Sequence, residues 1–134
     1  MKLRIHKDSI RFRFTRGEVE ALSHGRTLEE SVAVGPSAHQ TLAYRVTPAE
    51  GAPEGASIHA ALEDSRLTVS VPVGTLRAWH EGDQLAIDEE QVWDTGTLRI
   101  LLEKDLQRLN PKPDEEPAGV YPNPLFGKAR CDHP

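Results

Sequence analysis

Met1–Phe14 reads MKLRIHKDSIRFRF, and Ile58–Val71, further along the chain, reads IHAALEDSRLTVSV. In both stretches, apolar side chains alternate with polar ones on either side of a short polar break. Period-two alternation is typical of a β-strand with one buried face, and a short polar break between two such runs indicates a hairpin. The two stretches therefore predict that one supersecondary unit occurs twice in the chain.

The match between the two regions continues through their turns and glycines. The matched positions are Asp8-Ser9 with Asp64-Ser65, Gly17 with Gly74, and Gly25 with Gly82. Apolar positions also match, namely Val19 and Leu22 with Leu76 and Trp79, and Leu42, Tyr44 and Val46 with Leu98, Ile100 and Leu102. This agreement predicts an internal duplication.

A short helix is expected after each hairpin. Thr15 and Glu18 have the spacing of a capping box, and Gly25 lies where a C-terminal glycine ends a helix. In the second unit, Leu76 and Trp79 face the core three residues apart, and Gly82 follows. We therefore expect Trp79 to be buried.

Two more strands are expected in each unit. In the first unit they cover residues 28–34, with Val32 and Val34 facing inward, and residues 41–46. In the second unit, Leu85 and Ile87 begin one strand and residues 97–103 form the other. Trp93 lies near a turn and is expected to be exposed.

The predicted fold class is α+β, with two pseudo-symmetric strand–strand–helix–strand–strand units. Residues 1–108 are expected to form one duplicated domain, with units 1–47 and 57–103 and a linker at 48–56 rich in proline, glycine and glutamate. Two such units can cover each other's sheets as a closed antiparallel barrel or as two packed sheets, and the pattern leaves both open. Residues 109–134, rich in proline, predict an extended C-terminal tail.

Composition narrows the class of protein. The chain has 134 residues and a net charge of -5, which disfavours general binding to nucleic acid. The longest apolar runs are far too short for a membrane span, and Cys131 is the single cysteine. We therefore expect one cytoplasmic domain without membrane contact.

Basic residues gather in the first hairpin, in contrast to the acidic chain as a whole. With a turn at Lys7-Asp8, Arg4 lies opposite Arg11 and Lys2 opposite Arg13, and like charges across a strand pair are destabilising. The matching positions in the second unit are His59, Ala61, Thr68 and Ser70. Since the fold does not require cations there, Lys2, Arg4, Arg11 and Arg13 are either paired with acids on a neighbouring strand or form an anion site.

Other chemical signals are weak. Cys131, Asp132 and His133 are metal-ligand types, but four ligands at characteristic spacing are needed for a structural zinc site, so no metal is predicted. The sequence has no phosphate-cradling glycine loop and no serine nucleophile motif, so no catalytic residue and no cofactor are predicted. Asp114-Glu115-Glu116 could neutralise the basic hairpin, in the same chain or in a partner chain.

The chain resembles a family of small uncharacterised bacterial proteins. The resemblance is carried by the start MKLRI, by Ser9-Ile10-Arg11 with Arg13, by Glu103-Lys104-Asp105, and by Tyr121-Pro122-Asn123-Pro124. Leu106 departs from the pattern, since the family tends to have phenylalanine there. The resemblance implies a bacterial origin and an ordered Tyr121–Pro124 segment, and it carries no activity.

The function expected from the sequence is that of a non-enzymatic binding or interaction module with an anion site on the basic hairpin. Its partner would be an anionic small molecule or an acidic protein segment. Two alternatives stay open. One is a phosphate-handling enzyme that uses the arginine cluster with a carboxylate such as Glu103, and the other is a structural protein that assembles with itself, for example as a homodimer.

Overall fold

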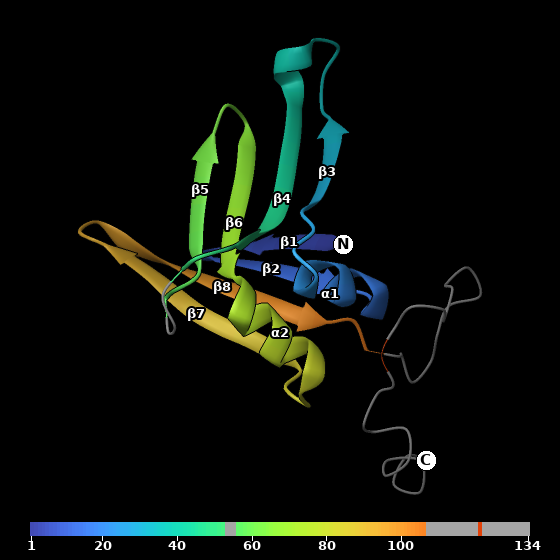
Figure 1. The fold of residues 1–134 in the computed structure, drawn as a ribbon. Helices are drawn as coiled ribbons and strands as arrows, with labels where there is room; N and C mark the ends of the chain where they lie inside the picture. Colours follow the sequence, from blue (N-terminus) through green and yellow to red (C-terminus); the bar gives the residue numbers. More distant parts are fainter. Residues whose placement is uncertain (53–55, 107–120, 122–134) are drawn as a thin grey trace, which may run out of the picture.

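The computed structural model describes residues 1–52, 56–106 and 121. There the chain forms two units with the same element order (Figure 1). The first unit consists of β1 (Lys2–His6), β2 (Ser9–Phe14), α1 (Arg16–Ser23), β3 (Leu28–Ala33), the short 3-10 helix η1 (Ala38–Gln40) and β4 (Thr41–Ala49). The second unit consists of β5 (His59–Glu63), β6 (Arg66–Pro72), α2 (Val73–Glu81), β7 (Ala86–Trp93) and β8 (Gly96–Lys104).

The units exchange hairpins to build two sheets. One four-stranded sheet has the order β1-β2-β8-β7 and the other β3-β4-β6-β5, so each sheet takes one hairpin from each unit. The structure thus has two packed sheets rather than a closed barrel. The expectation of purely antiparallel pairing is wrong at the sheet centres, where β2 pairs with β8 and β4 with β6 in parallel. A tight turn fixes strand direction only within its own hairpin, and these central strands come from different units.

Strand pairing gives the correspondence between the two units. Leu3 pairs with Phe12 in the first unit as Ala60 pairs with Val69 in the second. The turn at Lys7 corresponds to the turn at Asp64, and both residues have positive φ, 50° and 49°. The sequence match of Asp8-Ser9 with Asp64-Ser65 was therefore wrong by one position, because the strand register and not the shared letters sets the equivalence.

The ends of α1 follow the predicted pattern. The Thr15 side chain accepts a hydrogen bond from the Glu18 N–H at 3.3 Å, and Glu18 Oε1 accepts one from the Thr15 N–H at 2.9 Å. Gly25 follows the helix with φ of 88°, a conformation that glycine adopts without strain. The capping box and the terminal glycine are both confirmed.

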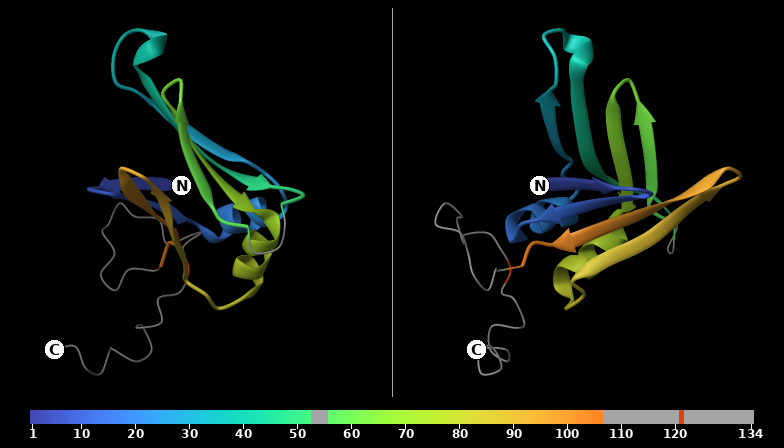
Figure 2. Two further views of the ribbon diagram at one scale, coloured as in Figure 1. Left: turned by 90° about the vertical axis from the view of Figure 1, so that its left-hand side faces the viewer. Right: turned by 180° about the vertical axis from the view of Figure 1, so that it is seen from behind.

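The hydrophobic core lies where the two sheets cross, with the helices packed against each other at one end (Figure 2). Trp79 of α2 is 1% exposed, as predicted. Its ring meets Phe14 of β2 edge to face, with 6.0 Å between the centroids. The core thus joins the two units rather than closing each by itself.

Four residues that alternation placed on the core face are exposed instead. Ile5, Leu62, Val32 and Val34 are 62%, 69%, 48% and 72% exposed. The strands extend past the region where the sheets cover each other, and the upper half of β3 and β4 projects freely in Figure 1. Alternation gives the face of a side chain, but it does not say whether the opposite sheet reaches that far.

Some predicted boundaries also differ. β4 continues through Pro48 to Ala49, two residues into the expected linker. β7 begins at Ala86, so the exposed Leu85 precedes the strand. Trp93 is half-exposed, as expected. The predictions for residues 109–134 fall outside the described residues except at Tyr121, whose N–H donates to the Asp105 carbonyl at 2.6 Å.

Candidate functional site

The four predicted site residues share the outer face of the β1–β2 hairpin. Lys2 pairs with Arg13 and Arg4 with Arg11, which confirms the predicted register. The alternation that turns Phe12 inward turns these four side chains away from the core. Like charges therefore lie directly opposite each other twice in one hairpin, an arrangement that costs stability unless anions lie close by.

Two of the four cations have carboxylate partners at the neighbouring strand end. Arg11 Nε lies 2.6 Å from Glu103 Oε1 of β8, and Lys2 Nζ lies 3.5 Å from Asp105 Oδ2. The first contact is an ion pair without hydrogen-bond alignment, since Glu103 Oε1 is buried and accepts no aligned hydrogen bond from the described groups. Parallel pairing of β2 with β8 brings these acids to the hairpin.

Arg4 and Arg13 differ from the other two cations. Among the described residues, neither forms an ion pair with a carboxylate. Arg4 and Arg11, together with His6 and Ser9, line a shallow hollow of about 240 Å³. Pockets for drug-sized ligands are generally about 300–1,000 Å³, so this hollow suits a single phosphate or carboxylate group. Arg13 does not line it.

Arg99 pairs with Ser9 in the strand register, but its guanidinium group is neutralised by Asp88. Its Nε donates to Asp88 Oδ1 at 3.0 Å and its terminal nitrogen to Oδ2 at 2.6 Å. This hydrogen-bonded fork lowers the pKa of Asp88 and raises the pKa of Arg99. The cations that face the hollow are therefore those of β1 and β2.

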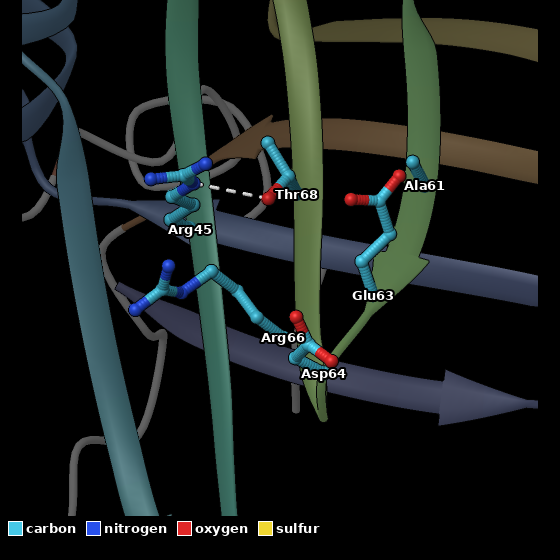
Figure 3. A pocket seen from close by; sticks show the side chains of 6 residues that line it. All are labelled: Arg45, Ala61, Glu63, Asp64, Arg66 and Thr68. Carbon is cyan, nitrogen blue, oxygen red and sulfur yellow. Dashed lines mark hydrogen bonds between the residues drawn. The ribbon is translucent and has the colours of Figure 1, made fainter.

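A second hollow occupies the equivalent place on the other sheet. It measures about 260 Å³, and Figure 3 shows its lining residues: Arg45, Ala61, Glu63, Asp64, Arg66 and Thr68. By strand register, Ala61, Glu63, Arg66 and Thr68 replace Arg4, His6, Ser9 and Arg11.

The charges of this second hollow are balanced within the protein. Arg45 Nε donates to Thr68 Oγ1 at 3.0 Å, and Arg66 Nε lies 2.9 Å from Glu29 Oε1. The two guanidinium groups lie on the β4 side, and the Glu63 carboxylate extends from β5 toward Thr68 (Figure 3). Two hollows of similar size thus differ in charge, one basic and one mixed.

Sequence reasoning missed two groups of residues. His6 and Ser9 continue the outward alternation of Arg4 and Arg11, a signal that could have found them. Lys104 continues the inward alternation of Ile100 and Leu102 and is buried.

Lys104 lies within an aromatic cluster at the end of β8. Its Nζ donates to the Gly82 carbonyl at 3.1 Å and lies 5.8 Å and 5.4 Å from the ring centroids of Trp79 and Tyr121. Burial lowers the pKa of Lys104 and raises the pKa of Tyr121. These contacts join α2, β8 and Tyr121.

The described residues place limits on other chemistry. In residues 1–52, 56–106 and 121, no three histidine, cysteine, aspartate or glutamate side chains gather as metal ligands would. Cys131 and His133 lie outside these ranges. No helix in the described part of the chain is long and apolar enough to cross a membrane.

Comparison with known proteins places the chain in a family. No curated protein and no solved structure matches it. A family model described as a family of unknown function (DUF7009) matches residues 1–125. The expectation of an uncharacterised family is thereby confirmed, and the chain belongs to this family of unknown function.

Proposed function

We propose that the protein is a non-enzymatic interaction module that binds a phosphate or carboxylate group in the hollow of its basic hairpin. The observation that carries this proposal is the position of Arg4. Its guanidinium group faces a hollow shared with Arg11, and no carboxylate of the described residues pairs with it. Guanidinium groups bind phosphate and carboxylate through paired hydrogen bonds, which makes them suited to such a site.

The other sheet supports the same proposal. At the equivalent positions, Ala61 and Thr68 replace Arg4 and Arg11, and the fold forms there without these cations. Packing therefore does not require the two arginines. Glu103 offsets part of the repulsion between them through its contact with Arg11, and a bound anion would relieve it further.

Thermal unfolding with added inorganic phosphate or pyrophosphate tests the proposal. A ligand that binds only the folded state adds about 2.7 kcal/mol at 100 times its dissociation constant, and this raises the melting temperature visibly. We expect a rise for the native protein. Arg4→Ala and Arg11→Thr, which copy Ala61 and Thr68, should abolish the rise while leaving the protein folded.

The chain offers a matched control in the second hollow. Arg66→Ser removes one arginine and copies Ser9, the equivalent residue, so its change in net charge equals that of Arg11→Thr. The anion-induced rise should survive in Arg66→Ser. If all three variants respond to phosphate as the native protein does, the basic hairpin is a solvated surface and the proposal is wrong.

A phosphate-handling enzyme is the second candidate, favoured by the position of His6 in the same hollow as the two arginines. Imidazole can transfer protons while guanidinium groups stabilise phosphoryl charge. Incubation with p-nitrophenyl phosphate checks this candidate. An enzyme would release nitrophenolate in the native protein and not in His6→Ala. If no nitrophenolate is released while phosphate still raises the melting temperature, the result favours the binding module over the enzyme.

A further inference from the structure

The free edge of β1 differs from its counterpart in the second unit. β1 and β5 are each the outermost strand of their sheet, next to β2 and β6. In a hairpin with a two-residue turn, alternate residues pair their backbone groups with the partner strand. His6 opposes Ser9 beside the turn. Leu3 and Ile5 therefore direct their N–H and C=O groups away from β2, toward the open edge.

The equivalent edge of β5 is closed by side chains of β7. Gln91 Oε1 accepts a hydrogen bond from the Ala60 N–H at 2.7 Å, and Gln91 Nε2 donates to the Ala60 carbonyl at 2.9 Å. Glu89 Oε1 accepts from the Ile58 N–H at 3.1 Å. One carboxamide thus makes both bonds that a further strand would make with Ala60.

Within the part of the chain that the structure describes, the edge of β1 lacks this closure. The first unit has a carboxylate contact equivalent to that of Glu89. Glu30 occupies the position equivalent to Glu89, and its carboxylate lies 3.3 Å from the Met1 amino group. In place of Gln91, however, the first unit has Val32, whose side chain cannot form hydrogen bonds and is half-exposed. No hydrogen bond among the described residues reaches the outward backbone groups of Leu3, the equivalent of Ala60.

The side chains along this edge alternate between two chemistries. Lys2, Arg4 and His6 lie on the outer face, and the apolar side chains of Leu3 and Ile5 lie on the inner face. A strand added to β1 would place alternate side chains beside the cations and beside these apolar groups.

We propose that β1 binds an extended peptide segment of a partner protein, with acidic and apolar side chains in alternation, as a fifth strand of its sheet. Backbone bonds to Leu3 and Ile5 give affinity, and the alternating side chains give specificity. A second copy of the chain is a poor occupant. Pairing β1 with β1 of another copy would oppose Lys2, Arg4 and His6 to the same cations.

The inference deepens the proposed function and rests on it for the role of Arg4, whose charge contributes to both sites. The two sites still separate by their geometry. The anion hollow needs the Arg11 side chain on the outer face, whereas the added strand needs the backbone groups of Leu3 that face the open edge.

The test is calorimetric titration with an N-acetylated, C-amidated peptide of about seven residues in which valine alternates with glutamate. We expect binding to the native protein. Replacing every glutamate of the peptide by lysine should weaken binding at least tenfold. Methylating the backbone nitrogens on one edge should abolish binding, because side chains and charge stay while edge hydrogen bonds are lost.

Val32→Gln is the decisive variant of the protein. It copies Gln91, so its carboxamide should close the β1 edge, weaken peptide binding at least tenfold and leave the response to phosphate intact. Val32→Thr is the matched control, because it keeps the shape of valine and should bind the peptide as the native protein does.

Each outcome decides between the two proposals. Equal binding of the glutamate and lysine peptides, or of the methylated and unmethylated peptides, overturns the added-strand inference. Peptide binding that fails while phosphate still raises the melting temperature overturns the inference and leaves the proposed function standing. If phosphate does not raise the melting temperature while the peptide still binds, only the proposed anion site in the hollow is overturned. Melting curves of Val32→Gln confirm folding, and the methylated peptide tests the inference independently of that variant.

Discussion

The β1 and β5 edges occupy equivalent positions in two units of the same element order, yet their surfaces differ. On β5 the edge is closed by Gln91 and the nearby hollow holds both arginines and carboxylates. On β1, where Val32 replaces Gln91, no described side chain closes the edge, and the hollow holds Arg4 and Arg11. Because the same elements form with either arrangement, packing does not explain the basic and open one. The comparison therefore supports the proposal that β1 and β2 carry a binding surface.

The core is the first place to test the comparison, and it gives the largest expected effect. Trp79 and Leu22 are equivalent helix residues, and both are fully buried. Trp79→Ala should lower the free energy of unfolding by about 3–5 kcal/mol, and Leu22→Ala by about 2–5 kcal/mol. Urea denaturation measures both. A loss below about 1 kcal/mol for Trp79→Ala would contradict its placement between the two units.

The edge closure gives the next effect. Gln91→Val copies Val32 and removes two hydrogen bonds to Ala60, each worth about 0.5–1.5 kcal/mol. We expect the free energy of unfolding to fall by about the contribution of these two hydrogen bonds. The Ala60 amide should also exchange hydrogen faster than in the native protein. The Leu3 amide of the native protein should already exchange quickly. Equal protection of Leu3 and Ala60 would show that the two edges do not differ.

The N-terminal caps of α1 and α2 also differ, and this difference gives a further test of the comparison between the two units. α1 begins with the Thr15–Glu18 capping box. The N-cap residue of α2 is Pro72, whose side chain makes no capping hydrogen bond. Thr15→Ala should cost about 1 kcal/mol, the usual effect of losing a cap. Thr75→Ala in the first turns of α2 serves as the control and should cost less. Chemical denaturation of both variants checks the order.

Lys104 gives the smallest effect, visible as a dependence on pH. Burial lowers its pKa in the folded protein from the usual 10.5, so above the folded pKa the unfolded chain binds more protons. Stability should therefore rise with pH toward 10.5. The raised pKa of Tyr121 acts oppositely above its usual 10.0, so the measurement belongs below that pH.

Lys104→Met keeps the apolar stem of the side chain and removes the ionisable group. Its unfolding free energy should lack the alkaline rise seen in the native protein. Thermal or urea unfolding between pH 7.5 and 9.5, in both proteins, makes the comparison. An identical pH dependence in the variant would show that Lys104 is not the titrating group.

Local features of the fold could be predicted from the sequence. Alternation placed Lys2, Arg4, Arg11 and Arg13 on one face, and the turn at Lys7 set their register, because a short hairpin fixes both. The Thr15–Glu18 cap followed from its spacing. Each of these depends on residues close together in the chain.

Features that depend on distant segments could not be predicted. The parallel pairing of β2 with β8 joins different units, so no local pattern encodes it. For the same reason the sequence predicted acids on a neighbouring strand as partners of the cations but did not identify Glu103 as the partner of Arg11. The exposure of Ile5 and Val32 depends on where the second sheet ends, which alternation does not report.

Amide chemical-shift mapping in solution tests the central claim most directly. The labelled protein would be titrated with pyrophosphate, and shifts compared between residues 3–12 and the equivalent residues 60–69. We predict shifts at Arg4, His6, Ser9 and Arg11, with the positions of Ala61, Glu63, Arg66 and Thr68 unchanged. Equal shifts in both stretches, or none in either, would contradict the claim that the first hairpin is the binding surface.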